Sequence, residues 1–231
     1  MKMERMNNRK PDELRPVTMK VGILGRADGS AMVRLGNTVA IAAVYGPREL
    51  HPKHLQDNTK AILQCNYAMA PFSTIERARP GPSRRSIEIS KVTREALEPA
   101  LFLEEFPRAV IDVYIIVTQA NAGTRTAGIN AASLALADAG VSMRGLVTAV
   151  AAGKIGDEFV LDLEGEEEEQ SSCDLPIAYM PNEKKFTLLQ MDGDLPKEDV
   201  EKVIKLAVKG CEILYEKQRA ALREKWIKEE I

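Results

Sequence analysis

Acidic residues crowd one short segment of this chain. Residues 163–169, LEGEEEE, hold five glutamates, and Asp174 follows after a run of small polar residues. Runs of like charge are usually solvated, so Glu164, Glu166 and Glu167 are expected to face solvent. Asp174 differs because it opens an apolar, strand-like stretch that would hold its carboxylate in place. Oxygen ligands suit Mg²⁺, so one carboxylate from the loop and one from the strand could share a cation with substrate phosphates.

A second chemical pattern is AGTRT at residues 122–126, between an apolar strand and an Ala-rich helix. The first N–H groups of a helix are unpaired and carry the positive end of its dipole, so an anion is stabilised there. Gly123 lets the anion approach, while Thr124 and Arg125 add hydroxyl and guanidinium donors. The pattern indicates a phosphate site. An equally good interpretation from spacing alone is that Thr124 or Thr126 caps the helix and Arg125 is exposed.

A third pattern is RPGPSRRS at residues 79–86, where a rigid Pro/Gly turn delivers Arg84 and Arg85 to the beginning of another helix. Adjacent arginines diverge, so one can bind a small anion while the other meets the backbone phosphate of a polymer. By itself the segment is better interpreted as a basic surface turn. The presence of a second candidate anion site favours the functional interpretation.

The basic loop PRELHPKHL at residues 47–55 contains both histidines of the chain. Arg48, His51, Lys53 and His54 could line a path for single-stranded nucleic acid, although the loop has no aromatic residue for base stacking. Its local sequence favours the plainer interpretation of a long hairpin loop.

These residues must be positioned by regular elements that the sequence pattern also predicts. In the first half, alternating and β-branched segments predict four strands that we expect to be antiparallel, at 17–24, 30–35, 38–45 and 61–69. Helical spacing begins at Ser86 and should break at Pro99. A strand at 108–119, apolar on both faces, is expected to be central, and the helix 126–139 should end at Gly140.

The second half repeats this order of elements. Strand-like runs occur at 146–155, 158–163, 174–180 and 185–191, and a long helix is expected over 196–228. There is no residue-by-residue repeat, so duplicated α+β lobes follow from element order only. We expect one domain over 1–231, with a loose tail at 1–10 and lobes at roughly 11–105 and 106–231.

Composition limits the possible functions. The chain has 231 residues, 45% of them hydrophobic, which is enough to bury a substantial core. With 32 basic and 34 acidic residues, any nucleic-acid binding needs a local cluster. Three cysteines without C-x-x-C spacing predict reduced thiols, and the N-terminus lacks an apolar signal region. We therefore expect a cytoplasmic protein without membrane insertion.

Several longer motifs resemble those of the RNase PH family of phosphorolytic exoribonucleases, and most closely the catalytic RNase PH-like subunits of archaeal exosomes. The similarity extends over nearly the whole chain. The motifs are ELRP (13–16), AAVYGPRELHPKHL (42–55), MAPFS (69–73), PSRRSIEISK (82–91), FPRAVIDV (106–113), AGTRTAG (122–128), AASLALADAG (131–140), LDL (161–163) and DLPIAYMP (174–181).

The resemblance implies a fold of duplicated lobes like domain 2 of ribosomal protein S5, with mixed sheets packed with helices. It also implies an activity: inorganic phosphate, with a divalent cation, attacks the 3′-terminal phosphodiester of single-stranded RNA and releases a nucleoside diphosphate, and excess diphosphate drives the reverse tailing reaction. The implied cation is Mg²⁺, or alternatively Mn²⁺. The implied partners are a non-catalytic RNase PH-like subunit, in a hexameric ring of three heterodimers, and S1/KH-type cap subunits.

The resemblance also assigns roles to residues. Arg85, Gly123, Thr124 and Arg125 correspond to the phosphate pocket. The remaining correspondences are Arg84 for an RNA-backbone contact, Asp174 and Glu168 for the catalytic and metal-binding carboxylates, and Arg48, His51, Lys53 and His54 for the RNA-binding pore loop.

Two departures from the family pattern concern the site and the N-terminus. Glu168 stands where the family has an aspartate, so a neighbouring glutamate could take that role. The Asp-Gly-Arg sequence that usually precedes ELRP is missing.

Two functions from different classes follow. The first is an exoribonuclease subunit that is weakly active or inactive without its partner. The alternative is a non-catalytic ring subunit of the same fold that binds RNA without cleaving it. The presence of both the anion pocket and the carboxylates favours the enzyme.

Overall fold

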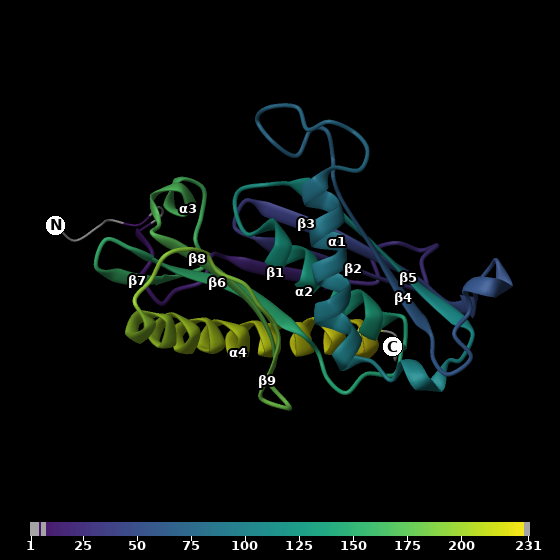
Figure 1. Cartoon of the computed structure of the whole chain (residues 1–231). Helices are drawn as coiled ribbons and strands as arrows, with labels where there is room; N and C mark the ends of the chain where they lie inside the picture. Colours follow the sequence, from purple (N-terminus) through teal and green to yellow (C-terminus); the bar gives the residue numbers. More distant parts are fainter. Residues whose placement is uncertain (1–4, 6–7, 229–231) are drawn as a thin grey trace.

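Two β-sheets with helices packed between and beside them make up the chain (Figure 1). The computed structural model describes Arg5 and residues 8–228. The first sheet has the strand order β1 (Val17–Val21), β2 (Gly29–Leu35), β3 (Thr38–Glu49), β5 (Ala109–Gln119) and β4 (Ile62–Met69). The second has the order β10 (Asp192–Gly193), β8 (Cys173–Met180), β6 (Thr148–Ile155) and β7 (Glu158–Leu161), and β9 (Lys185–Leu189) also pairs with β8.

The helices connect and cover these sheets. They are α1 (Arg84–Leu97), α2 (Thr124–Asp138), α3 (Glu166–Gln170) and α4 (Lys197–Lys228), with short 3₁₀ turns η2 (Lys53–Leu55), η3 (Glu98–Ala100) and η4 (Leu103–Glu105). The predicted α+β class, with mixed sheets packed with helices, is confirmed. None of the helices in the described part of the chain combines the length and apolar character that a membrane crossing requires.

Strand β4 runs parallel to β5, whereas we expected the first four strands to be antiparallel. The reason lies in the connection, because the chain leaves β4, forms α1 and returns through β5. A helix between two paired strands is the usual crossover that brings neighbours into parallel alignment. The remaining neighbours in the first sheet are antiparallel, as predicted.

The boundary between the lobes also differs from the prediction. Strand β5 was expected to open the second lobe at residue 106, but it hydrogen-bonds to β3 and to β4 and so belongs to the first sheet. The chain passes from one sheet to the other only after α2, in the segment that precedes β6. The predicted division at 105/106 is therefore wrong, because sheet membership follows long-range pairing rather than the order of elements.

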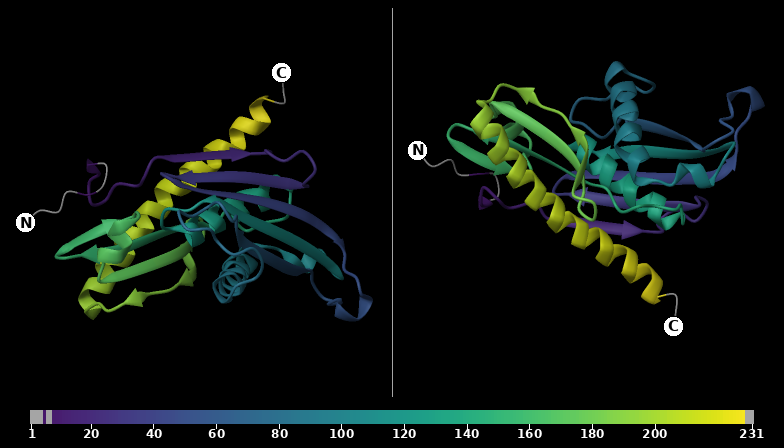
Figure 2. Two further views of the ribbon diagram at one scale, coloured as in Figure 1. Left: turned by 90° about the horizontal axis from the view of Figure 1, so that it is seen from above. Right: turned by 60° about the horizontal axis from the view of Figure 1, so that its bottom comes forward.

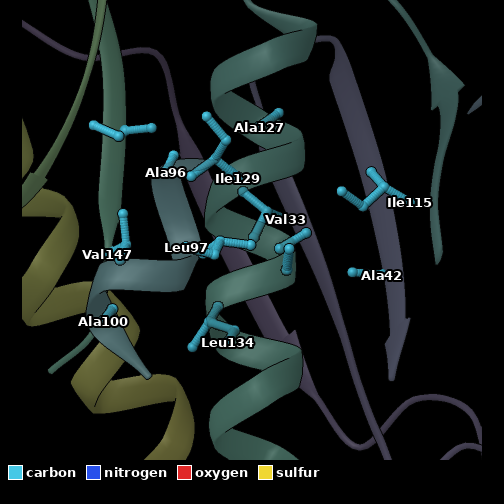
Figure 3. Packing of buried hydrophobic residues seen from close by; sticks show 14 of the residues in the cluster. Val33, Ala42, Ala96, Leu97, Ala100, Ile115, Ala127, Ile129, Leu134 and Val147 are labelled. Carbon is cyan, nitrogen blue, oxygen red and sulfur yellow. The ribbon is translucent and has the colours of Figure 1, made fainter. Parts of the chain in front are cut away.

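Helix α2 forms the centre of the core. Nearly all its residues are buried, and Ala127, Ile129 and Leu134 lie among side chains of the first sheet, α1 and β6 (Figure 3). Its small residues permit this close packing. A Cβ on Gly29 of β2 would fall 2.3 Å from the Ala135 carbonyl oxygen of α2. The helix ends before Gly140, whose φ of +71° is the left-handed conformation predicted for that position.

Helix α4 joins the two lobes along one side of the molecule (Figure 2). It packs on β6, β7 and β8 of the second sheet and on β1 of the first. Val203, Ala207, Cys211 and Leu214 form its fully buried stripe. The stripe continues to a buried polar residue, Gln218, whose Nε2 donates to the Val147 carbonyl at 3.1 Å.

Candidate active site

A cleft of about 580 Å³ brings together most of the predicted site residues. Its walls come from the start of α1, the start of α2, α3, β8 and the segment before and within β10. The lining includes Arg84, Arg85, Glu88, Gly123, Thr124, Arg125, Glu168, Asp174, Gln190 and Asp192. A second hollow of about 870 Å³ shares Arg85, Gly123, Thr124, Glu168, Asp174 and Asp192 with it. The two hollows therefore adjoin at the carboxylates and the start of α2.

The start of α2 has the features on which the predicted anion site depends. Gly123 is the residue before the helix and has φ +63°, and no side chain caps the first turn there. Thr126 is not the residue before the helix, and its hydroxyl donates to the Gly123 carbonyl at 2.9 Å. The Thr124 hydroxyl is buried near the phenol of Tyr67, but neither oxygen meets hydrogen-bond geometry with another described residue. The alternative of a simple threonine cap is therefore wrong.

Arg125 is held in place by two residues that sequence reasoning missed. Its Nη2 lies 3.1 Å from Glu88 Oε2 on α1, and its Nη1 donates to Gln190 Oε1. Gln190 Nε2 in turn donates to Glu88 Oε1 at 3.4 Å. The guanidinium is thus oriented by two elements rather than freely exposed. Glu88 follows Arg84 by four residues, and this helical spacing could have placed it beside the arginines.

Arg84 and Arg85 occupy the first turn of α1, and the helix start is fixed by a reciprocal cap. Ser86 N donates to Ser83 Oγ at 3.0 Å, and Ser83 N donates to Ser86 Oγ at 2.7 Å. Arg85 lines both hollows, whereas Arg84 lines only the first. The two arginines therefore line different parts of the cleft, and their division between a small anion and a polymer backbone stays a prediction.

Asp174 is the strongest carboxylate candidate. It lies in β8 opposite Gly153 on one side and Asp192 on the other. Its Oδ1 is buried without a hydrogen-bond partner among the described residues. Burial, followed by the charge of Glu168, raises the pKa of Asp174 to about 6, while Arg125 and Arg85 pull it down. The positive charges of Arg125 and Arg85 therefore do not fully offset the effects of burial and of Glu168 on the ionised Asp174 carboxylate.

Glu168 and Asp192 complete the acidic wall. Glu168 lies in α3 and lines both hollows. Asp192, which sequence reasoning missed, is exposed and pairs in register with Asp174. The cue was an Asp-Gly pair directly after a predicted strand. Within residues 5 and 8–228, no three His, Cys, Asp or Glu side chains converge closely enough to hold a metal ion by themselves.

The residues fit a cation that is shared with substrate. Mg²⁺ keeps several waters and typically takes one or two carboxylates together with substrate phosphate oxygens. The unpartnered Asp174 Oδ1, beside Glu168, offers this kind of incomplete ligand set. The donor atoms are all oxygens, which suits Mg²⁺ or Mn²⁺.

Two of the glutamates expected to be solvated are buried. Glu164 and Glu167 are 3% and 2% exposed, whereas Glu166 is exposed as predicted. The cause is pairing with arginines from the N-terminal segment. Arg5 Nη2 lies 2.8 Å from Glu167 Oε2, and Arg9 Nη2 lies 3.3 Å from an oxygen of each glutamate.

The same pairs correct the prediction of a loose tail at residues 1–10. Arg5 and Arg9 are 4% and 8% exposed and anchor the segment to the second lobe. The other part of that prediction, residues 1–4, 6 and 7, lies outside the described residues.

The loop with Arg48, His51, Lys53 and His54 does not line the cleft of its own chain. It lies around η2, at the end of the molecule opposite α3 in both Figure 1 and Figure 2. Arg48 pairs with Asp112, and the exposed His51 and Lys53 approach Glu49 at 3.6 and 3.8 Å. Any role of these residues in RNA binding stays a prediction.

A helix N-terminus flanked by arginines and faced by carboxylates defines a class of site that holds phosphate groups. Comparison with known proteins identifies the family of the chain. Residues 13–142 match the sequence model of the 3′ exoribonuclease family, domain 1, and residues 145–210 match that of domain 2. The chain therefore belongs to the RNase PH family of 3′ exoribonucleases.

Relatives agree with this assignment. The chain is 61% identical over 224 residues to exosome complex component Rrp41 of Pyrococcus furiosus, covering 97% of this chain and 90% of that protein. It is 56% identical to the protein of the same name from Methanopyrus kandleri, covering 96% and 93%. The predicted resemblance to archaeal exosome subunits of the RNase PH type is confirmed.

Solved structures confirm the fold. Rice Rrp46 superposes with a TM-score of 0.86 at 24% identity, over 95% of this chain and 100% of that one. An Archaeoglobus fulgidus exosome with RNA bound to the active site superposes with a TM-score of 0.80 at 22% identity, over 93% and 92%.

Proposed function

We propose that this cleft degrades RNA by phosphorolysis from the 3′ end. An oxygen of inorganic phosphate attacks the phosphorus of the terminal nucleotide, the bond to the 3′ oxygen of the preceding nucleotide breaks, and a nucleoside diphosphate leaves. The reverse reaction adds nucleotides from excess diphosphate. The observation that carries the proposal is that an uncapped helix N-terminus with arginines faces an under-compensated carboxylate across a single cleft.

One wall of the cleft would position the attacking phosphate. The first N–H groups of α2, together with the Thr124 hydroxyl, Arg125 and Arg85, would bind its oxygens. Arg125 is already oriented by Glu88 and Gln190, so little reorganisation accompanies phosphate binding. Phosphoryl transfer depends on such positioning and on charge neutralisation more than on a protein nucleophile. The chain supplies both.

The opposite wall would hold the RNA terminus and the cation. Asp174 and Glu168 would bind Mg²⁺, with Mn²⁺ as an alternative, and the cation would neutralise charge that develops on the transferring phosphate. The cation would then be a partner for the buried Asp174 oxygen, which has none among the described residues. Arg84, directed to the first hollow only, would contact the backbone phosphate of single-stranded RNA.

The assembly that we propose is a hexameric ring of three heterodimers with a non-catalytic RNase PH-like subunit, closed by S1/KH-type caps. The relatives that are 61% and 56% identical are themselves called exosome complex components, which supports an assembly of this kind. The position of the loop with His51, Lys53 and His54, remote from its own cleft, supports a role in a path lined by neighbouring subunits. A cytoplasmic location is supported by the free thiols of all three cysteines.

The alternative is a non-catalytic ring subunit that only binds RNA. Such a subunit needs no buried carboxylate opposite a phosphate site. The raised pKa of Asp174, caused first by burial, favours the enzyme instead.

The test uses RNA labelled in its 3′-terminal nucleotide, incubated with Mg²⁺ and phosphate and with the chain alone or together with its partner subunit. We expect labelled nucleoside diphosphate from the complex and little from the chain alone. Asp174→Asn should abolish release while RNA binding persists, and Asp194→Asn, an exposed aspartate nearby, is the matched control. Cleavage that does not require phosphate would refute the proposal.

A further inference from the structure

Three arginines of the N-terminal segment, Arg5, Arg9 and Arg15, are buried, and none of them lines either hollow of the cleft. They are 4%, 8% and 1% exposed. Their guanidinium groups meet the acidic segment 162–167, which directly precedes Glu168. We call these three residues the arginine clamp.

Arg15 connects the acidic segment to the turn before α2. Its Nη2 and Nε donate to the two carboxylate oxygens of Asp162 at 2.6 and 3.0 Å. Its Nη1 donates to the carbonyl oxygens of Asn121 and Ala122 at 2.8 and 3.4 Å. A Cβ on Gly123 would lie 2.7 Å from Nη2. Arg15 thus fills the space that any side chain at position 123 would need.

The contacts continue without a gap along the acidic segment. Asn121 Nδ2 donates to Glu164 Oε1 at 3.1 Å, and Arg9 Nη2 donates to Glu164 Oε2 and Glu167 Oε2 at 3.3 Å. Arg5 Nε and Nη2 donate to the two carboxylate oxygens of Glu167 at 3.1 and 2.8 Å. Glu167 Oε2 also accepts the Glu164 backbone N–H at 3.0 Å. The next residue is Glu168.

Charge explains why this network holds a fixed geometry. Among the described residues, three buried guanidinium groups face the buried carboxylates of Asp162, Glu164 and Glu167. Each of these ion pairs is also a buried, charge-assisted hydrogen bond, so loss of an arginine removes some of the bonds that hold a carboxylate in place. Removal of an arginine would therefore move the acidic segment outward and Glu168 with it.

We propose that Arg5, Arg9 and Arg15 are positioning residues that set the separation between Glu168 and the phosphate-binding turn at 121–123. They act through the acidic segment and, for Arg15, through the turn itself, and none of them lines the cleft. The inference rests on the proposed function, since it concerns the two walls of that cleft. Arg5 and Arg9 precede residue 13, where the match to the family begins.

The experiment compares Arg9→Gln with Arg26→Gln, a control at an exposed arginine, in the full chain. Hydrogen exchange at residues 163–170 should accelerate at least tenfold in Arg9→Gln alone. Mn²⁺ affinity, measured by paramagnetic resonance without RNA, should fall at least fivefold. In the complex with the partner subunit, KM for phosphate should change less than the Mn²⁺ requirement, because Arg15 still holds the turn.

Three outcomes separate the possibilities. Unchanged exchange at 163–170, or faster exchange with unchanged Mn²⁺ affinity and phosphate KM, overturns the positioning role while the proposed function stands. Absence of phosphorolysis by the wild-type complex refutes the proposed function instead, and the exchange result still decides whether the clamp holds the segment. If Arg9→Gln does not fold, Arg9→Lys keeps the charge but loses the second guanidinium nitrogen, which donates to the Asp162 carbonyl at 3.1 Å. It should give smaller changes in the same directions.

Discussion

Replacement of Asp174 by asparagine should stabilise the fold while it removes the activity. Burial and the nearby charge of Glu168 raise the pKa of Asp174 from 3.8 to about 6, and Oδ1 has no partner among the described residues. The folded chain therefore binds this proton more tightly than the unfolded chain does. The resulting stability is fully present below about pH 4 and is lost as the pH rises through about 6.

The magnitude follows from that difference. Each pKa unit corresponds to about 1.4 kcal/mol, so ionised Asp174 destabilises the cation-free chain by about 3 kcal/mol at pH 8. At pH 5 Asp174 is mostly protonated in the folded chain, and the cost falls to about 1.5 kcal/mol. The asparagine side chain of the variant stays neutral at both values, so Asp174→Asn should gain most of these amounts.

Urea unfolding at pH 5 and pH 8, without divalent cations, measures the effect. Asp194→Asn, at an exposed position nearby, should shift the free energy of unfolding by less than about 0.5 kcal/mol. Mg²⁺ should then stabilise the wild-type chain more than Asp174→Asn, because only the folded wild type offers the ligand. A variant no more stable than wild type at pH 8, or a gain that is equal at both pH values, would refute the reasoning.

Three further predictions concern the other wall and the core. Arg125→Ala removes charge-assisted hydrogen bonds worth about 1.5–3 kcal/mol, so KM for phosphate should rise roughly 10- to 150-fold. A phosphate titration measures this, and an unchanged KM would count against the pocket. Glu88→Gln keeps a hydrogen-bond acceptor for Arg125 but removes the carboxylate that competes with phosphate for it. The same titration should show KM for phosphate lowered about two- to fivefold, and a higher KM would contradict this. Gly29→Ala places its Cβ 2.3 Å from the Ala135 carbonyl oxygen and should lower the free energy of unfolding by about 1–3 kcal/mol, measured by thermal unfolding. An unchanged free energy of unfolding would show that the strand moves to make room.

Local chemistry explains which parts of the site could be predicted. The turn before α2 could be predicted from the sequence because its glycine, threonine and arginine stand at a helix start. The unpaired N–H groups there attract anions, and these residue types suit an anion site. Asp174 was accessible because it opens a strand. Glu88, Gln190 and Asp192 were missed because their positions depend on how α1 and the β9–β10 segment fold onto the cleft.

The wrong predictions share a physical cause, which is pairing between residues far apart in the chain. Arg5 and Glu167 are separated by 162 residues, so neither an acidic run nor a polar N-terminus revealed that each neutralises the other. Strand β5 was assigned to the wrong lobe because its hydrogen bonds to β3 and β4 cannot be inferred from alternation. Alternation and helical spacing predict that an element exists, but not its neighbour.

Phosphorolysis itself is tested most directly by the fate of inorganic phosphate. The chain, assembled with its partner subunit, is incubated with unlabelled RNA, Mg²⁺ and phosphate labelled with ³²P, and the products are separated. Attack by phosphate held at the start of α2 predicts nucleoside diphosphates that carry the label in the β-phosphate. Release of unlabelled nucleoside monophosphates would show that water is the attacking group and would contradict the role assigned to this cleft.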